Sequence, residues 1–277
     1  MGVMRMKKIK ISRILLYALA LVLAAITIYP LLWVFCGAIN TTAQMGTISI
    51  IPSGVTLDRV VSLFREYNFE KYFLNSFVYS VLATGISLLF NSMAAYAFAR
   101  LSFPGRDQIF AVYLGTMMIP FSIIMMPLYL MIREMNLNNT LWALILPGMS
   151  GAYGVFMLRQ FFMGIPRDLE EAARIDGLSY WGTYTRIVLP LSKPILLTQA
   201  VLGFSGCWNN YLWPTIINSK EKVFVISQGL SIFASYNETD WNATLAGSAV
   251  SMIPIILIFI LFQRQLVEGV KISGMKG

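Results

Sequence analysis

Six long runs of apolar residues constrain the fold of this chain more than any other feature. Each is close to the length of about twenty helical residues that crosses a hydrocarbon core. Lysine, aspartate and glutamate are absent from all six, and one arginine, Arg159, lies near the end of the fourth. A backbone inside a bilayer must satisfy its own hydrogen bonds, so we expect six helices. The predicted spans are Ile14–Cys36, Tyr72–Ala99, Ile109–Ile132, Leu141–Met163, Ile195–Ile217 and Leu245–Phe262.

The composition agrees with a membrane protein. Hydrophobic residues make up 57% of the chain and charged residues 12%, whereas soluble domains carry roughly a quarter charged residues. A length of 277 residues accommodates these spans and their loops but no large additional soluble domain. We predict an all-α integral membrane protein that forms one membrane domain over residues 1–277. The first run is too long for a cleaved signal peptide, so we expect it to stay as a span.

The placement of lysine and arginine predicts the orientation, because basic residues concentrate in cytoplasmic loops. With the N-terminus inside, the inner side holds Arg5, Lys7, Lys8, Lys10, Arg13, Arg100, Arg106, Arg159, Arg167, Arg174, Arg186, Lys193, Arg264, Lys271 and Lys276, and the outer side holds Arg59, Arg65, Lys71, Arg133, Lys220 and Lys222. Both termini and the segment 164–194 are then cytoplasmic. Topology accounts for the net charge of +8, so we expect no nucleic-acid partner.

Residues that could carry catalysis or bind a metal are scarce. The chain has no histidine, and its two cysteines, Cys36 and Cys207, lie in apolar runs. Zinc, haem and dithiol chemistry therefore have no ligand set. The sequence contains no Gly-Lys dipeptide and hence no P-loop for a nucleotide. We expect no catalytic residue, no metal and no cofactor.

A polar and aromatic cluster interrupts the fifth apolar run. It consists of Trp208, Asn209, Asn210 and Tyr211. Amides cost free energy in lipid, so these groups should face the interior of the bundle. Hydrogen bonding between helices is one explanation. A substrate pathway is the other, since amides bind hydroxyl groups and aromatic rings stack on sugars.

The polar segment between the fourth and fifth runs has the pattern of two short helices. Pro166 suits a first helical turn, and Arg167–Ile175 follows with acidic residues near its N-terminus, where the helix dipole favours them. Gly177 can adopt the left-handed conformation that ends a helix. A second helix is predicted over Ser179–Val188, interrupted by Pro190. A pair of interfacial helices that covers the bundle is possible, but the first helix has few large apolar residues, which favours docking on a protein.

The spacing in this segment resembles a known motif. Glu-Ala-Ala, three residues, Gly, nine residues and Ile-x-Leu-Pro match the EAA loop of bacterial ATP-binding cassette (ABC) importer permeases, at Glu171, Ala172, Ala173, Gly177, Ile187, Leu189 and Pro190. Further stretches resemble the carbohydrate-importer branch, which includes the shorter maltose permease subunit. They are Ile165–Gly177, Asn75-Ser76, Ala94–Arg100, Met117–Pro120, Pro127–Tyr129, Trp208-Asn209 and the tail Gly269–Gly277.

The resemblance implies a type I ABC importer permease fold with six transmembrane helices, a core over 71–262 and a cytoplasmic EAA coupling loop over 164–194. It implies a non-catalytic subunit in the lipid bilayer of a bacterial cell membrane, which passes a carbohydrate, expected to be an oligosaccharide. The implied partners are a second homologous permease, a dimer of separate ATP-binding cassette ATPase subunits and an extracellular solute-binding protein. The seven matched residues are the expected ATPase contacts, and residues 208–211 the expected pathway.

Two other classes of protein share some of these features. An ion-coupled secondary carrier usually has ionisable groups inside the membrane, and the six runs contain no acidic residue or histidine. A membrane-embedded enzyme needs a nucleophile, a base or a metal set near the bilayer, and none assembles from this sequence. Association with an ATPase distinguishes the importer from both.

Overall fold

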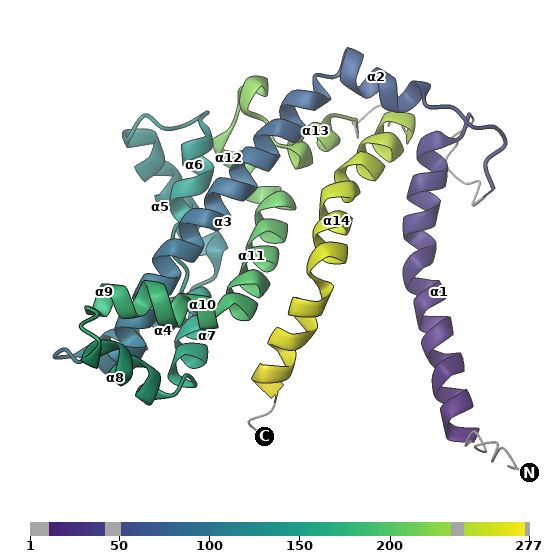
Figure 1. The fold of residues 1–277 in the computed structure, drawn as a ribbon. Coiled ribbons are helices and arrows are strands. Elements are labelled where there is room, and N and C mark those ends of the chain that lie inside the picture. Colours follow the sequence, from purple (N-terminus) through teal and green to yellow (C-terminus); the bar gives the residue numbers. More distant parts are fainter. Residues whose placement is uncertain (1–10, 42–50, 234–240, 275–277) are drawn as a thin grey trace, which may run out of the picture. The chain divides into compact units, whose positions relative to one another are not determined.

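The computed structural model describes residues 11–41, 51–233 and 241–274, and most of these residues are helical (Figure 1). Three helices are long and apolar enough to cross a membrane alone: Leu15–Ile39, Phe69–Arg100 and Ala243–Gln265. Three further pairs of helices meet the same criterion only when each bent pair is taken as one span. The expected all-α membrane architecture with up to six spans is therefore confirmed, but three of the spans are broken.

The chain divides into two compact units, of which the first contains the described residues within 1–67 and 233–250. It holds α1 (Ile11–Ile39), α2 (Asp58–Glu66) and the first turns of α14 (Trp241–Gly274). A Cβ at Gly37 would lie 2.8 Å from Leu245 Cδ1, so glycine permits α1 and α14 to touch. Asn40 Oδ1 accepts hydrogen bonds from the backbone N–H and the hydroxyl of Ser53, which links the end of α1 to the segment before α2.

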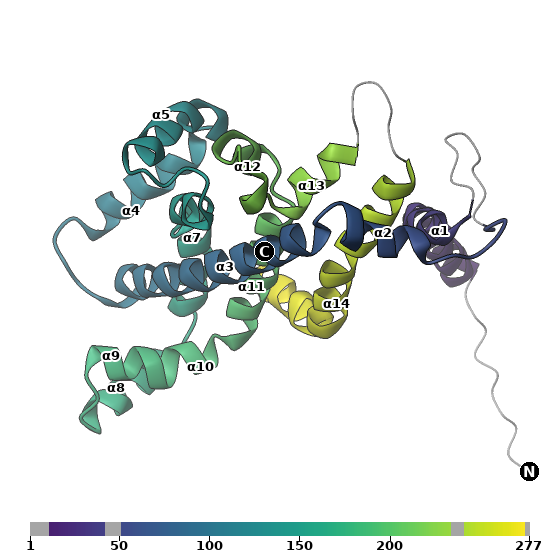
Figure 2. The ribbon, with the colours of Figure 1, turned by 90° about the horizontal axis from the view of Figure 1, so that it is seen from above.

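The second unit, within 68–232 and 251–277, is built around α3 (Phe69–Arg100). This helix packs against α7 (Ala152–Met163) and α11 (Lys193–Trp208), as Figures 1 and 2 show. A buried cluster lies at each end of α3. One contains Tyr79, Leu144, Ile145, Trp213 and Ile217, and the other contains Tyr96, Phe110, Leu158, Phe162, Tyr184 and Val188.

The third, fourth and fifth predicted spans are not continuous helices. In the third, α4 (Arg106–Gly115) and η1 (Thr116–Met118) meet α5 (Phe121–Glu134) at 100°. In the fourth, α6 (Leu141–Ile145) and η2 (Leu146–Gly148) meet α7 at 46°. The third bent pair joins Tyr180–Leu191 to α11 at 77° and so begins ahead of the predicted fifth span. Within the predicted fifth span, α11 ends at Trp208 and α12 (Leu212–Ile217) follows after three residues. A short loop with η4 (Glu221–Val223) leads to α13 (Ile226–Phe233).

Prolines explain two of these breaks, because a proline lacks the N–H that the carbonyl four residues earlier would accept. Pro147 leaves the carbonyl of Ala143 without its helical donor, and the indole N–H of Trp213 donates to that carbonyl at 3.0 Å. Pro214 likewise leaves the carbonyl of Asn210 without a helical donor, and the Ser227 hydroxyl donates to that carbonyl at 2.7 Å. Side chains from other segments thus satisfy the freed carbonyls.

Amide side chains stabilise the break in the fourth span. Asn91 Oδ1 accepts hydrogen bonds from the backbone N–H of Gly151 at 3.0 Å and the Ser150 hydroxyl at 3.1 Å, where α7 begins. Gln199 Nε2 donates to the carbonyl of Gly154 at 2.8 Å. A Cβ at Gly154 would lie 2.4 Å from Asn91 Nδ2, so a larger residue there would displace the asparagine that holds the start of α7. The interior amides therefore hold an irregular backbone in place.

Candidate functional site: a helical hairpin at one end of α3

The predicted polar hairpin forms between the fourth and fifth spans. Its first helix is α8 (Arg167–Ile175), and its second arm runs through α9 (Tyr180–Thr183), η3 (Tyr184–Val188) and α10 (Leu189–Leu191). The prediction that Pro190 interrupts this second arm is wrong. Tyr184–Val188 forms a wider π-helical turn, which accommodates the proline ring and its missing N–H. The arm ends at Ser192, whose N–H and hydroxyl donate to the carbonyl of Val188.

Gly177 sets the turn between the two arms. Its φ is +84°, and a Cβ there would meet no atom within 4 Å, so the constraint is on the backbone and not on space. The N–H of Leu178 donates to the carbonyl of Ala173, and the N–H of Gly177 donates to that of Arg174, both at 3.0 Å. This pair of bonds is a Schellman motif. Ser179 then caps α9 by accepting from the N–H of Gly182 at 3.2 Å.

The two faces of α8 differ in what they contact. Glu170 and Ala173 are buried against the rest of the second unit, where α8 packs on α9 and η3. Leu169, Ala172 and Ile175 are exposed on the other face, and Ile175 is 86% exposed. Of the two alanines in the motif, only Ala172 is therefore open to a partner.

The remaining residues of the motif also divide between the interior and the surface. Glu171, Gly177 and Pro190 are exposed. Ile187 and Leu189 are half-buried, and Leu189 packs against the buried cluster at this end of α3. The hairpin thus brings the seven predicted residues onto one structure, with part of the set supporting it from inside.

A buried arginine joins the hairpin to the long helices. Arg100, the last residue of α3, is 7% exposed in its side chain, and its Nε lies 2.5 Å from Glu170 Oε1 of α8. The contact is an ion pair and not a directed hydrogen bond, because neither atom meets hydrogen-bond geometry. A terminal nitrogen of Arg100 also donates to the carbonyls of Phe162 and Ile165 at 2.6 Å each. One side chain therefore links α3, the end of α7 and α8.

A tyrosine provides a second attachment from the other arm. The hydroxyls of Tyr184 and Ser92 lie 2.8 Å apart, and the Tyr184 ring packs 5.2 Å from that of Tyr96. Ser92 and Tyr96 both belong to α3. Both arms of the hairpin are thus tied to the same long helix.

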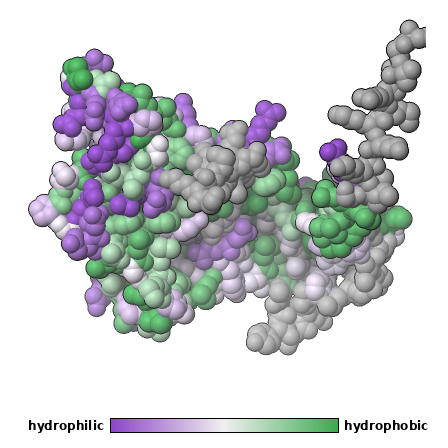
Figure 3. Space-filling view, turned by 90° about the horizontal axis from the view of Figure 1, so that it is seen from below, coloured by the Kyte–Doolittle hydropathy of each residue, from purple (hydrophilic) through white to green (hydrophobic). Residues whose placement is uncertain are grey.

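The hairpin exposes four large apolar side chains. Leu169, Ile175, Tyr180 and Trp181 are all exposed, while Figure 3 shows hydrophilic residues gathered over the side of the molecule that carries α8 and α9. Exposed apolar side chains with a polar rim are typical of a protein-binding surface. We call these four residues with Ala172 the docking stripe. Sequence reasoning missed most of them, although the three-residue spacing of 169, 172 and 175 marks one helical face.

The predicted pathway residues do not share one environment. Trp208 is 2% exposed, stacks on Phe204 and donates its indole N–H to the carbonyl of Ser251 at 3.0 Å. Asn210 is half-buried and donates to the Tyr79 hydroxyl at 3.4 Å. Asn209 and Tyr211 are exposed, at the break between α11 and α12. Two of the four are thus placed to support the break and two to present polar atoms at the surface.

Metal ligands do not cluster in the part of the chain that the structure describes. No three side chains of histidine, cysteine, aspartate or glutamate lie close enough there to hold a metal ion.

Comparisons with known proteins agree with this architecture. Residues 87–272 match the family described as "Binding-protein-dependent transport system inner membrane component". The arabinooligosaccharides transport system permease protein of Halalkalibacterium halodurans is 35% identical, over 92% of this chain and 93% of its own length. The lactose transport system permease protein of Rhizobium radiobacter is 30% identical, over 94% of this chain and 95% of its own length.

A solved structure has the same fold. A chain of a bacterial ABC transporter involved in the import of the acidic polysaccharide alginate superimposes with a TM-score of 0.83 at 22% identity. The match covers 92% of this chain and 96% of that one. The broken spans therefore belong to a fold that has been observed in a transporter.

Proposed function

We propose that this chain, which belongs to the family of binding-protein-dependent transport system inner membrane components, forms half of the pathway by which a bacterium imports an oligosaccharide. The chain is a multi-pass membrane permease subunit and not an enzyme. Relatives named for arabinooligosaccharides and lactose support a carbohydrate substrate longer than one sugar unit. The proposed location of the chain is the bacterial cell membrane.

The proposed partners complete the transporter. A second homologous permease forms the other half of the pathway, two ATP-binding cassette subunits hydrolyse ATP, and a solute-binding protein delivers the sugar from outside. A structural relative supports this assembly, since it was solved as a bacterial alginate ABC transporter in complex with an alginate pentasaccharide-bound periplasmic protein. In our proposal the hairpin and both termini are cytoplasmic, which the distribution of lysine and arginine favours.

The hairpin is the proposed coupling element, over residues 164–194 within a core at 71–262. Its docking stripe would sit in a cleft of the ATPase, beside Glu171 and Gly177, while Arg100 and Tyr184 hold its inner face to α3. Closure of the ATPase dimer on ATP would move the stripe, and the attachments would pass that movement to the spans. A difference in docking free energy between two states of one rigid body is sufficient for such coupling.

The observation that carries this proposal is the exposure of Ile175 on a helix whose opposite face is fixed by a buried ion pair. We expect Ile175→Glu to reduce ATPase stimulation by the sugar-loaded binding protein about tenfold or more, because a charge replaces an apolar side chain in the contact. Ile175→Leu is the matched control and should retain stimulation. The assay uses the whole transporter in proteoliposomes, with sugar uptake measured in parallel.

Undiminished stimulation and uptake in Ile175→Glu would remove the stripe from the coupling contact. Sugar uptake that follows an ion gradient and needs no ATPase would instead favour the ion-coupled secondary carrier. Co-purification of the ATPase separates these outcomes directly, because the importer retains it and the carrier does not.

The proposed sugar pathway runs past the break between α11 and α12. Asn209 and Tyr211 are the contacts we assign to it, because both are exposed there, and amide and aromatic groups suit hydroxyls and sugar faces. Trp208 and Asn210 shape the break from inside. We expect Asn209→Leu to raise the sugar concentration needed for half-maximal uptake without loss of the assembled complex. Unchanged uptake of every oligosaccharide tested would exclude Asn209 from the pathway.

A further inference from the structure

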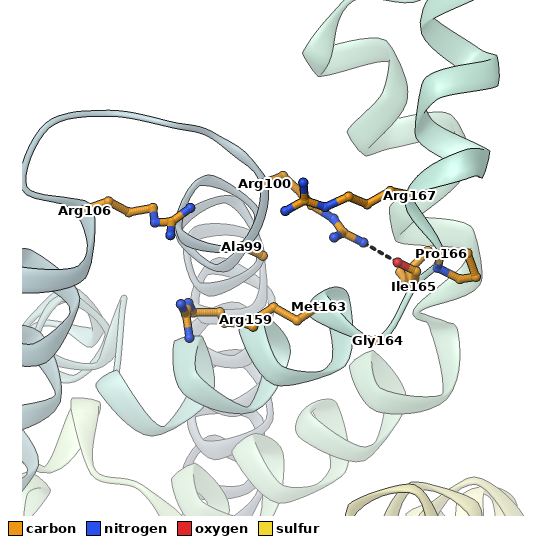
Figure 4. A pocket seen from close by; sticks show the side chains of 9 residues that line it. All are labelled: Ala99, Arg100, Arg106, Arg159, Met163, Gly164, Ile165, Pro166 and Arg167. Carbon is orange, nitrogen blue, oxygen red and sulfur yellow. Dashed lines mark hydrogen bonds between the residues drawn. The ribbon is translucent and has the colours of Figure 1, made fainter.

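Four arginines surround a pocket beside the start of the hairpin. The pocket has a volume of about 370 Å³ and is lined by Arg100, Arg106, Arg159 and Arg167 together with the loop 164–166 (Figure 4). These side chains come from the end of α3, the start of α4, the end of α7 and the start of α8. Residues far apart in the sequence thus place four guanidinium groups around one space.

Carboxylates balance only part of this charge. Glu170 pairs with Arg100. Asp107 accepts two hydrogen bonds from Arg106, at 3.0 and 3.3 Å, and lies 3.8 Å from Arg159. Among the residues that the structure describes, Arg167 has neither a hydrogen bond nor an ion pair through its guanidinium. Four cations face two carboxylates, which leaves two positive charges without a counterion in the described part of the chain.

The position of the pocket makes this excess informative. The long candidate span of α3 ends at Arg100, so in the predicted orientation the pocket lies on the cytoplasmic side of the membrane. The first backbone N–H groups of α8 are also beside it, and the N-terminus of a helix favours an anion. Arginine offers a planar fork of donors that matches phosphate oxygens in pairs. Basic pockets between transmembrane helices on the cytoplasmic side are suited to lipid headgroups.

We propose that this pocket binds a phosphate group, carried by an anionic phospholipid of the inner leaflet or free in the cytoplasm. Arg106 also donates to the carbonyl of Leu101 at 3.4 Å, and Arg159 donates through Nε to the carbonyl of Phe98 at 3.2 Å, with its guanidinium 4.3 Å from the centre of the Phe110 ring. A bound phosphate would accept from Arg167 on one side and from the remaining terminal N–H groups of Arg106 and Arg159 on the other. It would therefore connect α8 to α4 and α7, next to the ion pair of Arg100. The binding stands on the geometry alone, whereas an effect on coupling rests on the proposed function.

The test compares two arginines of the hairpin in the whole transporter. Arg167→Gln removes the unpaired cation of the pocket, and Arg186→Gln removes an exposed arginine of the second arm that does not line it. Complexes are prepared in nanodiscs of phosphatidylglycerol or phosphatidylcholine, and retained lipid is counted by native mass spectrometry. In a separate measurement, inorganic phosphate is added to the phosphatidylcholine nanodiscs and the melting temperature of the transporter is followed.

We expect Arg167→Gln to weaken phosphatidylglycerol retention about tenfold, the size of one lost charge-assisted contact, while Arg186→Gln retains it. A rise in melting temperature with inorganic phosphate, lost in Arg167→Gln, would assign the pocket to the free anion. The proposal would be overturned if the unsubstituted protein, Arg167→Gln and Arg186→Gln all retained phosphatidylglycerol equally and inorganic phosphate did not raise the melting temperature. An acidic ATPase side chain cross-linked to residue 167 would also overturn it, since the partner would then fill the pocket.

The outcomes for the pocket and for the transport function can be told apart. Failure of phosphate binding with intact stimulation by the sugar-loaded binding protein would refute the pocket alone. Sugar uptake that follows an ion gradient and needs no ATPase would refute the importer assignment, whatever the pocket binds.

Discussion

At the scale of single residues, Arg100 has a role that a lysine could not fill. Its guanidinium contacts a carboxylate and two backbone carbonyls from different segments. Arginine presents five donors in a fixed plane, whereas an ammonium group is a single point charge. The Arg100 side chain is nearly buried. If either member of its ion pair were removed, the other charge would be left unpaired in the protein interior, where a charge costs free energy.

Glu170→Ala should therefore destabilise the hairpin, because it leaves the Arg100 charge buried and uncompensated at a cost of about 3–5 kcal/mol. We expect a lower melting temperature of the purified complex and a loss of coupled ATPase activity. The exchanged pair, Arg100→Glu with Glu170→Arg, should not recover either property. A glutamate at position 100 cannot donate to the carbonyls of Phe162 and Ile165. Recovery by the exchange would show that the charge pair alone matters.

Ala173 illustrates how one position in the motif serves the fold. It is 5% exposed, and its carbonyl accepts the bond that closes the turn at Gly177. A bulky residue there would displace α8 from α9 and η3 before any partner binds. Ala172, one residue earlier, is exposed and is the position at which bulk tests docking directly.

At the scale of elements, the turn at Gly177 determines the direction of the docking stripe. An L-residue in the left-handed region has a conformational energy about 1–2 kcal/mol higher, and the penalty is smaller for asparagine than for most residues. Gly177→Val should therefore reduce coupled ATPase activity more than Gly177→Asn, although a Cβ at this position meets no neighbour. Hydrogen exchange at Leu178 measures the opening of the turn. Equal exchange and equal activity in both variants would indicate that the left-handed backbone is not needed.

The broken spans depend on compensation between elements. Trp213→Phe leaves the carbonyl of Ala143 without a donor, and a buried unsatisfied carbonyl costs about 1–3 kcal/mol. Pro147→Ala restores a backbone N–H that can donate a hydrogen bond to this carbonyl. We expect the loss of thermal stability from Trp213→Phe to shrink in the Pro147→Ala background, as measured in a double-mutant cycle. Strictly additive effects would mean that the indole bond and the proline act independently.

At the scale of the whole molecule, the orientation of the chain decides what the hairpin can meet. Basic residues predict that it faces the cytoplasm, together with the pocket of four arginines. The loop that contains Lys220 lies, by the same count, on the outside. An ATPase in the cytoplasm can reach the docking stripe only in this arrangement.

Cysteine labelling tests the orientation. Cys36 and Cys207 are the two native cysteines, and both are replaced by alanine. Single cysteines are then introduced as Glu171→Cys and Lys220→Cys. In intact spheroplasts, we expect a membrane-impermeant maleimide to label position 220 and to reach position 171 only after lysis. Labelling of position 171 in intact spheroplasts would reverse the topology and exclude a cytoplasmic ATPase as the partner of the hairpin.

Local features of the chain are enough to predict the membrane class, up to six spans and the helix–turn–helix with its glycine turn. These features follow from local properties: apolar length, the dipole preference of acids and the freedom of Gly177 at positive φ. The EAA spacing indicated the family because the whole pattern lies within one short segment of the chain.

Which side of each helix faces inward became clear from the three-dimensional packing. Glu170 and Arg100 are 70 positions apart in the chain, and nothing in their local pattern predicts that they meet. The breaks in the spans depend on distant donors such as Trp213 and Ser227. The pocket of arginines likewise depends on four separate elements that meet in space. Such contacts are set by the packing of distant segments, which hydrophobic periodicity along one segment does not contain.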